Sequence, residues 1–97
     1  MALSYQEQSE LMRDGVFQGR IKVAALSFSQ YILNELPNVQ GHTSRYRWAQ
    51  QTAQAPDSMA QQLQPLVVMD GAVQSAGANV TDAALQSAVE GVVSKLF

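Results

Sequence analysis

Hydrophobic residues recur every three or four positions along most of the chain, which is the period of an amphipathic α-helix. The longest such segment covers residues 16–35, and one stripe along it contains Phe17, Ile21, Ala24, Phe28, Ile32 and Glu35. A second stripe beside it contains Val23, Leu26, Gln30 and Leu33. A helix that is apolar on two sides is normally covered on two sides, so we expect residues 16–35 to form a long central helix.

Start and stop signals define a shorter helix before the central one. Ser4 and Glu7 match a capping box, in which each residue satisfies a backbone donor of the other, and predict a helix over about residues 5–13. Asp14 can cap the central helix that follows. Leu36-Pro37 ends the central helix, because proline has no amide hydrogen to donate.

A third helix is expected after a short polar loop. Either His42 or Thr43 can cap it, and it runs to about Gln54. The residues that align on one face of this helix are Tyr46, Ala49 and Ala53.

A fourth segment begins at Asp57 or Ser58 and runs to about Gln64, where Pro65 is expected to break it. Residues 66–69 (Leu-Val-Val-Met) come next. Four apolar residues do not distinguish a strand from a buried turn of helix, so both interpretations stay open.

The C-terminal part of the chain ends in an amphipathic helix over about residues 82–96. Asp70-Gly71 either ends a strand or caps a helix over residues 72–76, and residues 77–79 form a loop. Thr81 caps the last helix. The apolar stripe of that helix contains Leu85, Ala88, Val89, Val92, Val93 and Leu96.

The whole pattern predicts an all-α protein: a small single-domain bundle of four to six helices over residues 1–97. Ninety-seven residues is the length of one ordinary domain. Hydrophobic residues make up 46%, which suits a globular chain, but charged residues make up only 14%, against about 25% in an average soluble protein. With a net charge of −2, such a surface offers little long-range repulsion between copies.

The composition also narrows the chemistry. The absence of cysteine excludes disulfides, thiolate nucleophiles and zinc sites built on sulfur. The longest apolar runs have four residues, against about 20 for a transmembrane helix, so we expect no membrane contact of that kind. His42 is the only histidine and is interpreted as a cap or surface residue, and no carboxylate cluster or phosphate-loop motif is present. We therefore predict no enzyme, no cofactor and no metal.

The sharpest local feature is the segment Arg45-Tyr46-Arg47-Trp48, in which arginines alternate with aromatic residues. The aromatic residues can pack in the core with the arginines outside, or the segment can form a protein interface, where Trp, Tyr and Arg are enriched. It can also stack on single-stranded nucleic acid. Residues two apart do not share a helical face, and the net charge is negative, so nucleic-acid binding is only the alternative function.

Charge is unevenly spread along the chain. Residues 1–50 hold five basic and four acidic residues, a balance of +1, whereas residues 51–97 hold one basic and four acidic residues, a balance of −3. This asymmetry suggests the hypothesis of head-to-tail contact between copies, as in a ring.

Several segments resemble a small protein that is common in tailed-bacteriophage genomes. They are Tyr5-Gln6-Glu7, residues 17–25 (Phe-Gln-Gly-Arg-Ile-Lys-Val-Ala-Ala), residues 32–35 (Ile-Leu-Asn-Glu), Arg47-Trp48-Ala49 and Val80-Thr81-Asp82. Such proteins are encoded among the capsid and neck genes, and the resemblance implies a helical virion structural protein. This chain is richer in glutamine and serine than the basic, alanine-rich members, so no functional residue is transferred from them.

We therefore expect a non-enzymatic virion protein that docks in multiple copies on portal, neck, tail or major capsid proteins. A head–tail connector or head-completion role is favoured over a capsid cement role. The expected locations are the virion and, before assembly, the host cytoplasm. The apolar chain ends are expected to take part in contacts, and the interface candidates are Tyr5, Arg20, Arg45, Arg47, Trp48, Val93, Leu96 and Phe97.

Overall fold

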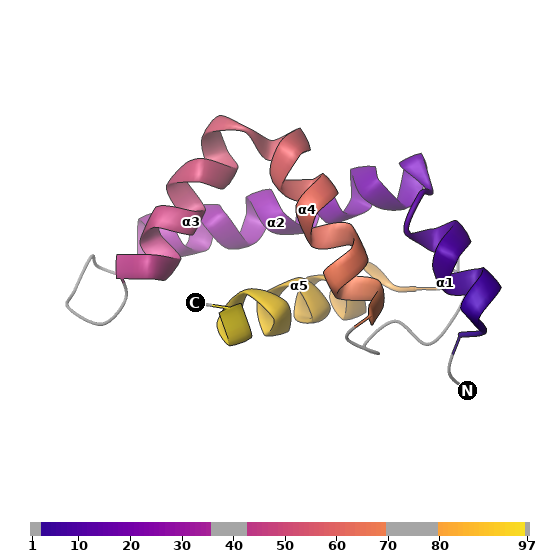
Figure 1. Ribbon diagram of the computed structural model, residues 1–97. Helices are drawn as coiled ribbons and strands as arrows, with labels where there is room; N and C mark the ends of the chain where they lie inside the picture. The colour runs from indigo at the N-terminus through magenta and orange to yellow at the C-terminus, as the bar shows by residue number, and fades with distance from the viewer. Residues whose placement is uncertain (1–2, 36–42, 70–79, 97) are drawn as a thin grey trace.

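The computed structural model describes residues 3–35, 43–69 and 80–96. All of the regular structure in these ranges is helical, which confirms an all-α bundle with a long central helix and an amphipathic C-terminal helix. The helices in chain order are α1 (Tyr5–Leu11), α2 (Gly15–Glu35), α3 (Thr43–Gln54), α4 (Pro56–Met69) and α5 (Asp82–Leu96) (Figure 1).

Three helix starts have the side-chain caps that the sequence predicts. The Ser4 hydroxyl accepts from the Glu7 amide at 3.1 Å, and Glu7 Oε1 accepts from the Ser4 amide at 3.0 Å. The Ser4 backbone donor lowers the pKa of the Glu7 carboxyl. Asp14 Oδ1 accepts from the amides of Val16 and Phe17 in the first turn of α2. Thr81 Oγ1 accepts from the Ala84 amide in α5. These bonds satisfy amides that a helix start otherwise leaves without partners.

Helix α2 is the central helix of the bundle, because α3, α4 and α5 all pack against it (Figure 1). The predicted stripe is buried from end to end of the helix, except for Glu35, and its buried members are Phe17, Ile21, Ala24, Phe28 and Ile32. The second predicted stripe is covered only in part: Val23 and Gln30 are exposed, whereas Leu26 and Leu33 are partly buried and Leu33 packs against the core. The small residues Ala25 and Ser29 are buried instead, because they let the neighbouring helices approach α2 closely.

The face that α3 turns to the core overlaps only in part with the predicted face of Tyr46, Ala49 and Ala53. Trp48, Ala49 and Thr52 are buried, whereas Ala53 is exposed and Tyr46 is only partly buried. The indole ring of Trp48 lies 5.9 Å from the ring of Phe28, centroid to centroid. Burying the large indole is worth more than burying an alanine methyl group, so it sets the rotation of the helix.

Pro65 lies inside α4, so the prediction that it ends the fourth helix is wrong. Proline cannot donate to the carbonyl of Gln61, but Gln61 is on the exposed side of the helix. Leu63, Val67 and Val68 are buried on either side of the proline. Each buried side chain of this size contributes about 1.5–3 kcal/mol, and together they outweigh the roughly 3 kcal/mol that proline costs. Residues 66–69 are therefore helical.

The side chain of Gln64 joins α4 to the junction between α1 and α2. Its amide Nε2 donates to the carbonyl of Leu11 at 2.7 Å and to that of Asp14 at 3.0 Å. The side chain is buried, and both acceptors belong to the turn where α1 ends. That turn comes at Leu11, two residues before the predicted end of α1.

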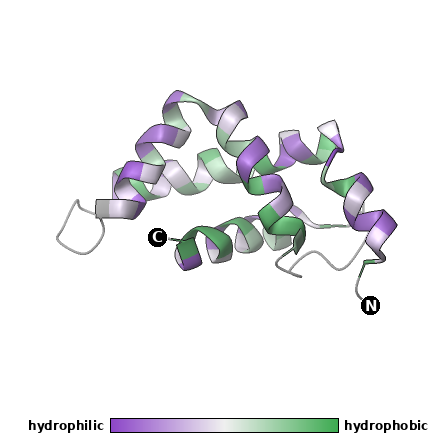
Figure 2. Cartoon of the chain, viewed as in Figure 1, coloured by the Kyte–Doolittle hydropathy of each residue, from purple (hydrophilic) through white to green (hydrophobic). Residues whose placement is uncertain are grey.

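The buried residues of all five helices belong to one hydrophobic cluster. Figure 2 shows hydrophobic residues concentrated along α5 and the C-terminal part of α4, whereas α1 and α3 are largely hydrophilic. The stripe predicted for α5 is buried from Leu85 to Val93, but Leu96 is exposed. The predictions for Leu36-Pro37, His42, residues 70–79 and Phe97 lie outside the described residues.

Replacing Gln64 by leucine is expected to lower the free energy of unfolding by about 1–3 kcal/mol. Leucine has a similar volume, but it removes two hydrogen bonds, one to the carbonyl of Leu11 and one to that of Asp14, each worth about 0.5–1.5 kcal/mol. Chemical denaturation of both proteins measures the difference. Unchanged stability would mean that the junction of α1 and α2 does not depend on this bridge.

Replacing Pro65 by alanine is expected to raise the free energy of unfolding by about 1–3 kcal/mol, because alanine restores a helical hydrogen bond and relieves the clash of the proline ring. Thermal unfolding followed by circular dichroism tests this. A lower melting temperature would show that the ring itself is needed for packing.

Candidate functional site

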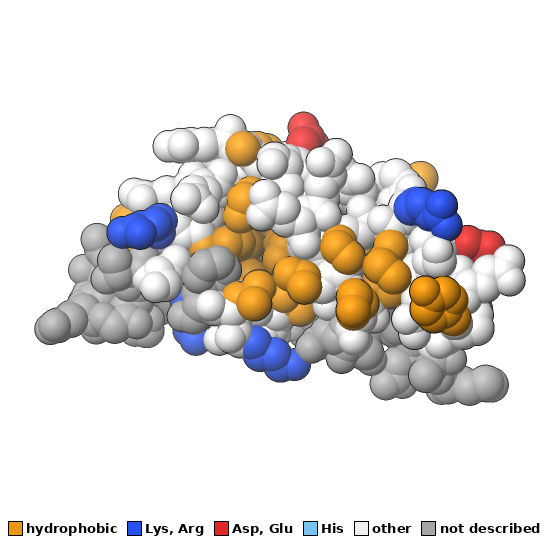
Figure 3. Space-filling model, in the orientation of Figure 1, with side chains coloured by type: hydrophobic (Ala, Val, Ile, Leu, Met, Phe, Trp, Pro, Cys, Tyr) orange, Lys and Arg blue, Asp and Glu red, His pale blue; other side chains and the backbone are white. Residues whose placement is uncertain are grey.

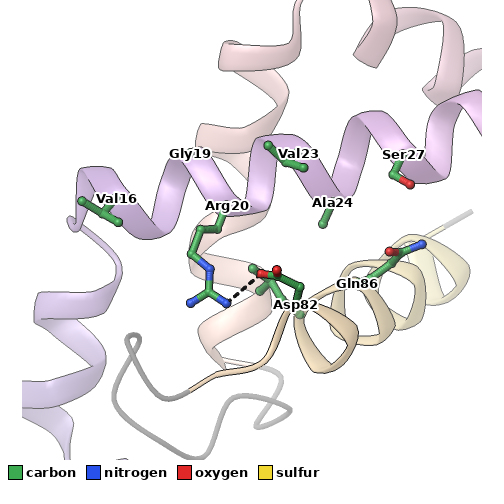
Figure 4. A pocket seen from close by; sticks show the side chains of 9 residues that line it. Val16, Gly19, Arg20, Val23, Ala24, Ser27, Asp82 and Gln86 are labelled. Carbon is green, nitrogen blue, oxygen red and sulfur yellow. Dashed lines mark hydrogen bonds and ion pairs between the residues drawn. The ribbon is translucent and has the colours of Figure 1, made fainter.

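A groove of about 470 Å³ runs between α2 and the first turns of α5 (Figure 4). Most of its lining comes from one side of α2, and the remainder comes from the start of α5. The lining residues are Val16, Gly19, Arg20, Val23, Ala24, Ser27, Asp82, Leu85 and Gln86. Grooves and clefts of this volume are typical of binding sites in proteins.

Apolar side chains at the rim of the groove are uncovered. Val16 is 77% exposed and Val23 is 68% exposed. They lie seven residues apart, with Gly19 between them, so all three face the same side of α2. A Cβ atom placed on Gly19 would meet nothing within 4 Å, which means that the surface between the two valines is open. Beneath them, Ala24 and Leu85 are buried.

One ion pair closes the end of the groove. The guanidinium of Arg20 lies 3.0 Å from a carboxylate oxygen of Asp82 and also donates to the carbonyl of Val80 (Figure 4). These contacts tie the start of α5 to α2. The carboxylate of Asp82 is almost fully exposed, so the pair contributes no more than about 1 kcal/mol to stability. Because the two charges cancel, the groove carries no net charge at this end.

The structure brings only one of the predicted interface residues, Arg20, into the groove. Tyr5 is exposed on α1, and Leu96 is exposed at the end of α5. Val93 is fully buried in the core, and Phe97 lies outside the described residues. Sequence reasoning missed Val16 and the exposure of Val23, because it placed Val23 in a covered stripe. Periodicity identifies the apolar positions of residues 16–35, but it does not show which of them a neighbouring helix covers.

The arginine and aromatic residues of α3 are divided between the surface and the core. Trp48 is only 2% exposed, so its ring is not at the surface for stacking on a ligand. Arg47 is exposed, whereas Arg45 and Tyr46 are partly buried. Trp48 and Arg47 match the interpretation in which the aromatic residues pack inside and the arginines point outward, whereas Arg45 and Tyr46 do not differ in burial.

Further exposed apolar residues lie on α4 and α5. They are Leu66, Met69 and Leu96. Figure 3 shows hydrophobic side chains gathered over α4 and α5 in the middle of the face that it presents. This face is separate from the groove, whose lining comes from α2 and the start of α5.

Within residues 3–35, 43–69 and 80–96, no three His, Asp or Glu side chains come together in a way that could hold a metal ion. None of the helices in those ranges is both long and apolar enough to cross a bilayer. His42 lies outside the described residues. What the described groove offers is therefore apolar contact with a few hydrogen-bonding groups at its edge.

Comparisons of the chain with protein-family models, with curated proteins and with solved structures gave no match.

Two glycines in helix interiors form a matched pair for testing the groove. Gly19 lines it, whereas Gly91 lies on α5 away from its lining, and a Cβ atom meets nothing within 4 Å at either position. Replacing either glycine by alanine is expected to raise the free energy of unfolding by about 0.5–1 kcal/mol, since alanine is the better helix former. Denaturation of the two variants measures this. A loss of stability in Gly19→Ala alone would mean that the groove is closed in solution.

Proposed function

We propose that this protein is a non-enzymatic structural protein of a tailed-bacteriophage particle, which docks on a larger virion protein through the groove between α2 and α5. The observation that supports the proposal best is the exposure of Val16 and Val23 on either side of Gly19. Contiguous exposed apolar surface with a polar rim marks protein interaction sites, and the two valines border one groove with Arg20, Ser27 and Gln86 at its edge.

The shape of the groove favours a helix of the partner as its occupant. Along α2, the lining extends from Val16 to Ser27, which is about 16 Å at 1.5 Å per residue, or three helical turns. A helix laid into such a groove presents apolar residues at positions i, i+3 or i+4, and i+7. The buried side chains of Ala24 and Leu85 form a floor for those residues.

The polar groups around the groove favour a partner helix with little charge. The guanidinium of Arg20 and the carboxylate of Asp82 already satisfy each other, and the other polar lining residues, Ser27 and Gln86, are neutral. A charged partner residue would lose its hydration there without gaining a counter-ion. The low overall content of charged residues fits the same kind of contact.

The resemblance to small proteins of the phage head and neck modules supports placing the partner in that region, with a portal or neck protein favoured over the capsid surface. Docking on such an assembly occurs in many symmetric copies. Individual contacts can then be weak, because linked contacts reinforce one another. A domain of 97 residues with a groove of this size suits this arrangement.

Replacing Val23 by glutamate is expected to reduce incorporation into particles about tenfold or more, because a carboxylate in the covered groove loses hydration that no partner restores. The control is Gln51→Glu, which adds the same charge at an exposed position of α3, outside the groove. Each variant is supplied to a phage that lacks the gene, and the protein is then quantified in purified particles by mass spectrometry.

The Gly19→Ala variant adds a test that is independent of charge and leaves the fold at least as stable. Its methyl group narrows the groove where a partner helix approaches, so incorporation should fall, whereas Gly91→Ala should be incorporated normally. Equal incorporation of Val23→Glu and the wild type would refute docking through the groove. Absence of the wild-type chain from particles would refute the virion role itself.

A further inference from the structure

The molecule is elongated, with principal extents of 41 × 22 × 19 Å. Different helices form the two ends of its long axis. One end holds α1 and the start of α2, and the opposite end holds the end of α2 and the start of α3 (Figure 1). The two ends differ in charge, and this difference does not follow the division into N-terminal and C-terminal halves of the sequence.

The end that holds α1 is acidic. Glu7 and Glu10 are exposed on α1, and Asp14 is exposed at the start of α2. Arg13 is the cation beside them, and it donates to Ser9 of its own helix. The Arg20–Asp82 pair adds no net charge. Three carboxylates against one guanidinium leave this end with a balance of −2.

The end that holds the start of α3 is basic. Arg45 and Arg47 lie in the first turns of α3, where the helix dipole is also positive, and the first turn has no acidic residue. Glu35 is exposed at the end of α2, so the described charges at this end, two guanidinium groups and one carboxylate, leave a balance of +1. Two cations at the positive end of a helix are unfavourable for an isolated molecule, so an anionic surface that covers them would stabilise them.

Each end also exposes a tyrosine. Tyr5 at the acidic end is 89% exposed, and Tyr31, near the basic end, is 51% exposed. The ring of Tyr31 stacks on Phe28, which in turn contacts Trp48 of α3, so this tyrosine is held beside the arginine-bearing turns. Tyrosine and arginine are the residues most enriched where proteins bind each other.

We propose that the acidic end of one copy binds the basic end of a second copy of the same chain, with Glu7 and Glu10 facing Arg45 and Arg47. The opposite charges of the two ends identify the partner, because each end fits the other and repels itself. The two surfaces differ, so the contact is head-to-tail and leaves one free end on each side for a further copy. This contact rests on the proposed function only in that both interactions bring several copies of the chain together. The four charged residues of the contact do not line the groove.

The structure revises the charge hypothesis drawn from the two halves of the sequence. Lys22 and Asp57, which come from opposite halves, pair with each other within one molecule at 3.0 Å. The acidic end is made of N-terminal residues that the sequence count placed in the slightly basic half. What matters for contact between copies is therefore the position of the charges along the long axis.

A charge-swap experiment tests the contact by sedimentation velocity. The variant Glu7→Gln/Glu10→Lys makes the acidic end basic and keeps the α1 cap, since glutamine also serves in a capping box. The variant Arg45→Glu/Arg47→Glu makes the basic end acidic. Each variant alone should associate about tenfold more weakly than the wild type, because its two ends now repel each other. An equimolar mixture of the two should regain association, since every contact in it joins opposite charges.

The wild-type protein should associate at about 0.01 M ionic strength, where the Debye length is roughly 30 Å, and dissociate near 1 M, where it is roughly 3 Å. A wild type that stays monomeric at low salt, or a mixture of the two variants that does not associate, would overturn the proposal. Val23→Glu should still self-associate. Normal incorporation of Val23→Glu, with a wild type that self-associates, therefore refutes only docking through the groove. Loss of incorporation in Val23→Glu, with a wild type that stays monomeric at low salt, refutes only the contact between ends.

Discussion

The packing of α3, α4 and α5 on the single helix α2 is the constraint on which the rest of the structure depends. Among the described residues, α2 makes the most extensive contacts of any helix, and Phe17, Ile21, Phe28 and Ile32 anchor the core along its whole length. Three helices cannot surround a cylinder completely. The side of α2 that carries Val16 and Val23 is left open, and the same arrangement that forms the core thus also forms the groove.

Helix positions were largely predictable because the signals are local. The Ser4–Glu7 box, the Asp14 cap and the Thr81 cap act within three residues, and the α5 stripe follows the helical period. Pro65 was misjudged because the cost of an interior proline is local, whereas the burial of Val67 and Val68 that outweighs it depends on other helices.

The candidate site was much less predictable than the fold. Periodicity identifies the apolar sides of α2, but it does not say which side lacks a neighbour, so Val23 was placed in the core. Trp48 was an interface candidate because tryptophan is enriched at interfaces, but its ring is buried and packs on Phe28. Among the interface candidates, exposure separates Tyr5, Arg47 and Leu96 from the buried Trp48 and Val93.

The structure shows where the few charges of the chain lie relative to the groove and to the ends of the molecule. The groove is neutral because Arg20 and Asp82 cancel, whereas most of the remaining charge is gathered at the two ends of the molecule. An apolar groove for a larger partner and charged ends for a second copy are compatible on one small domain, because they occupy different surfaces. This division accounts for a chain that is poor in charge and still carries ends of opposite sign.

Imaging of intact phage particles at side-chain resolution tests the central claim most directly. We expect copies of this chain related by local symmetry at the head or neck, with the α2–α5 groove covered by a helix of a larger protein. Particles that lack the chain, or that contain it with Val16 and Val23 facing solvent, would contradict the account.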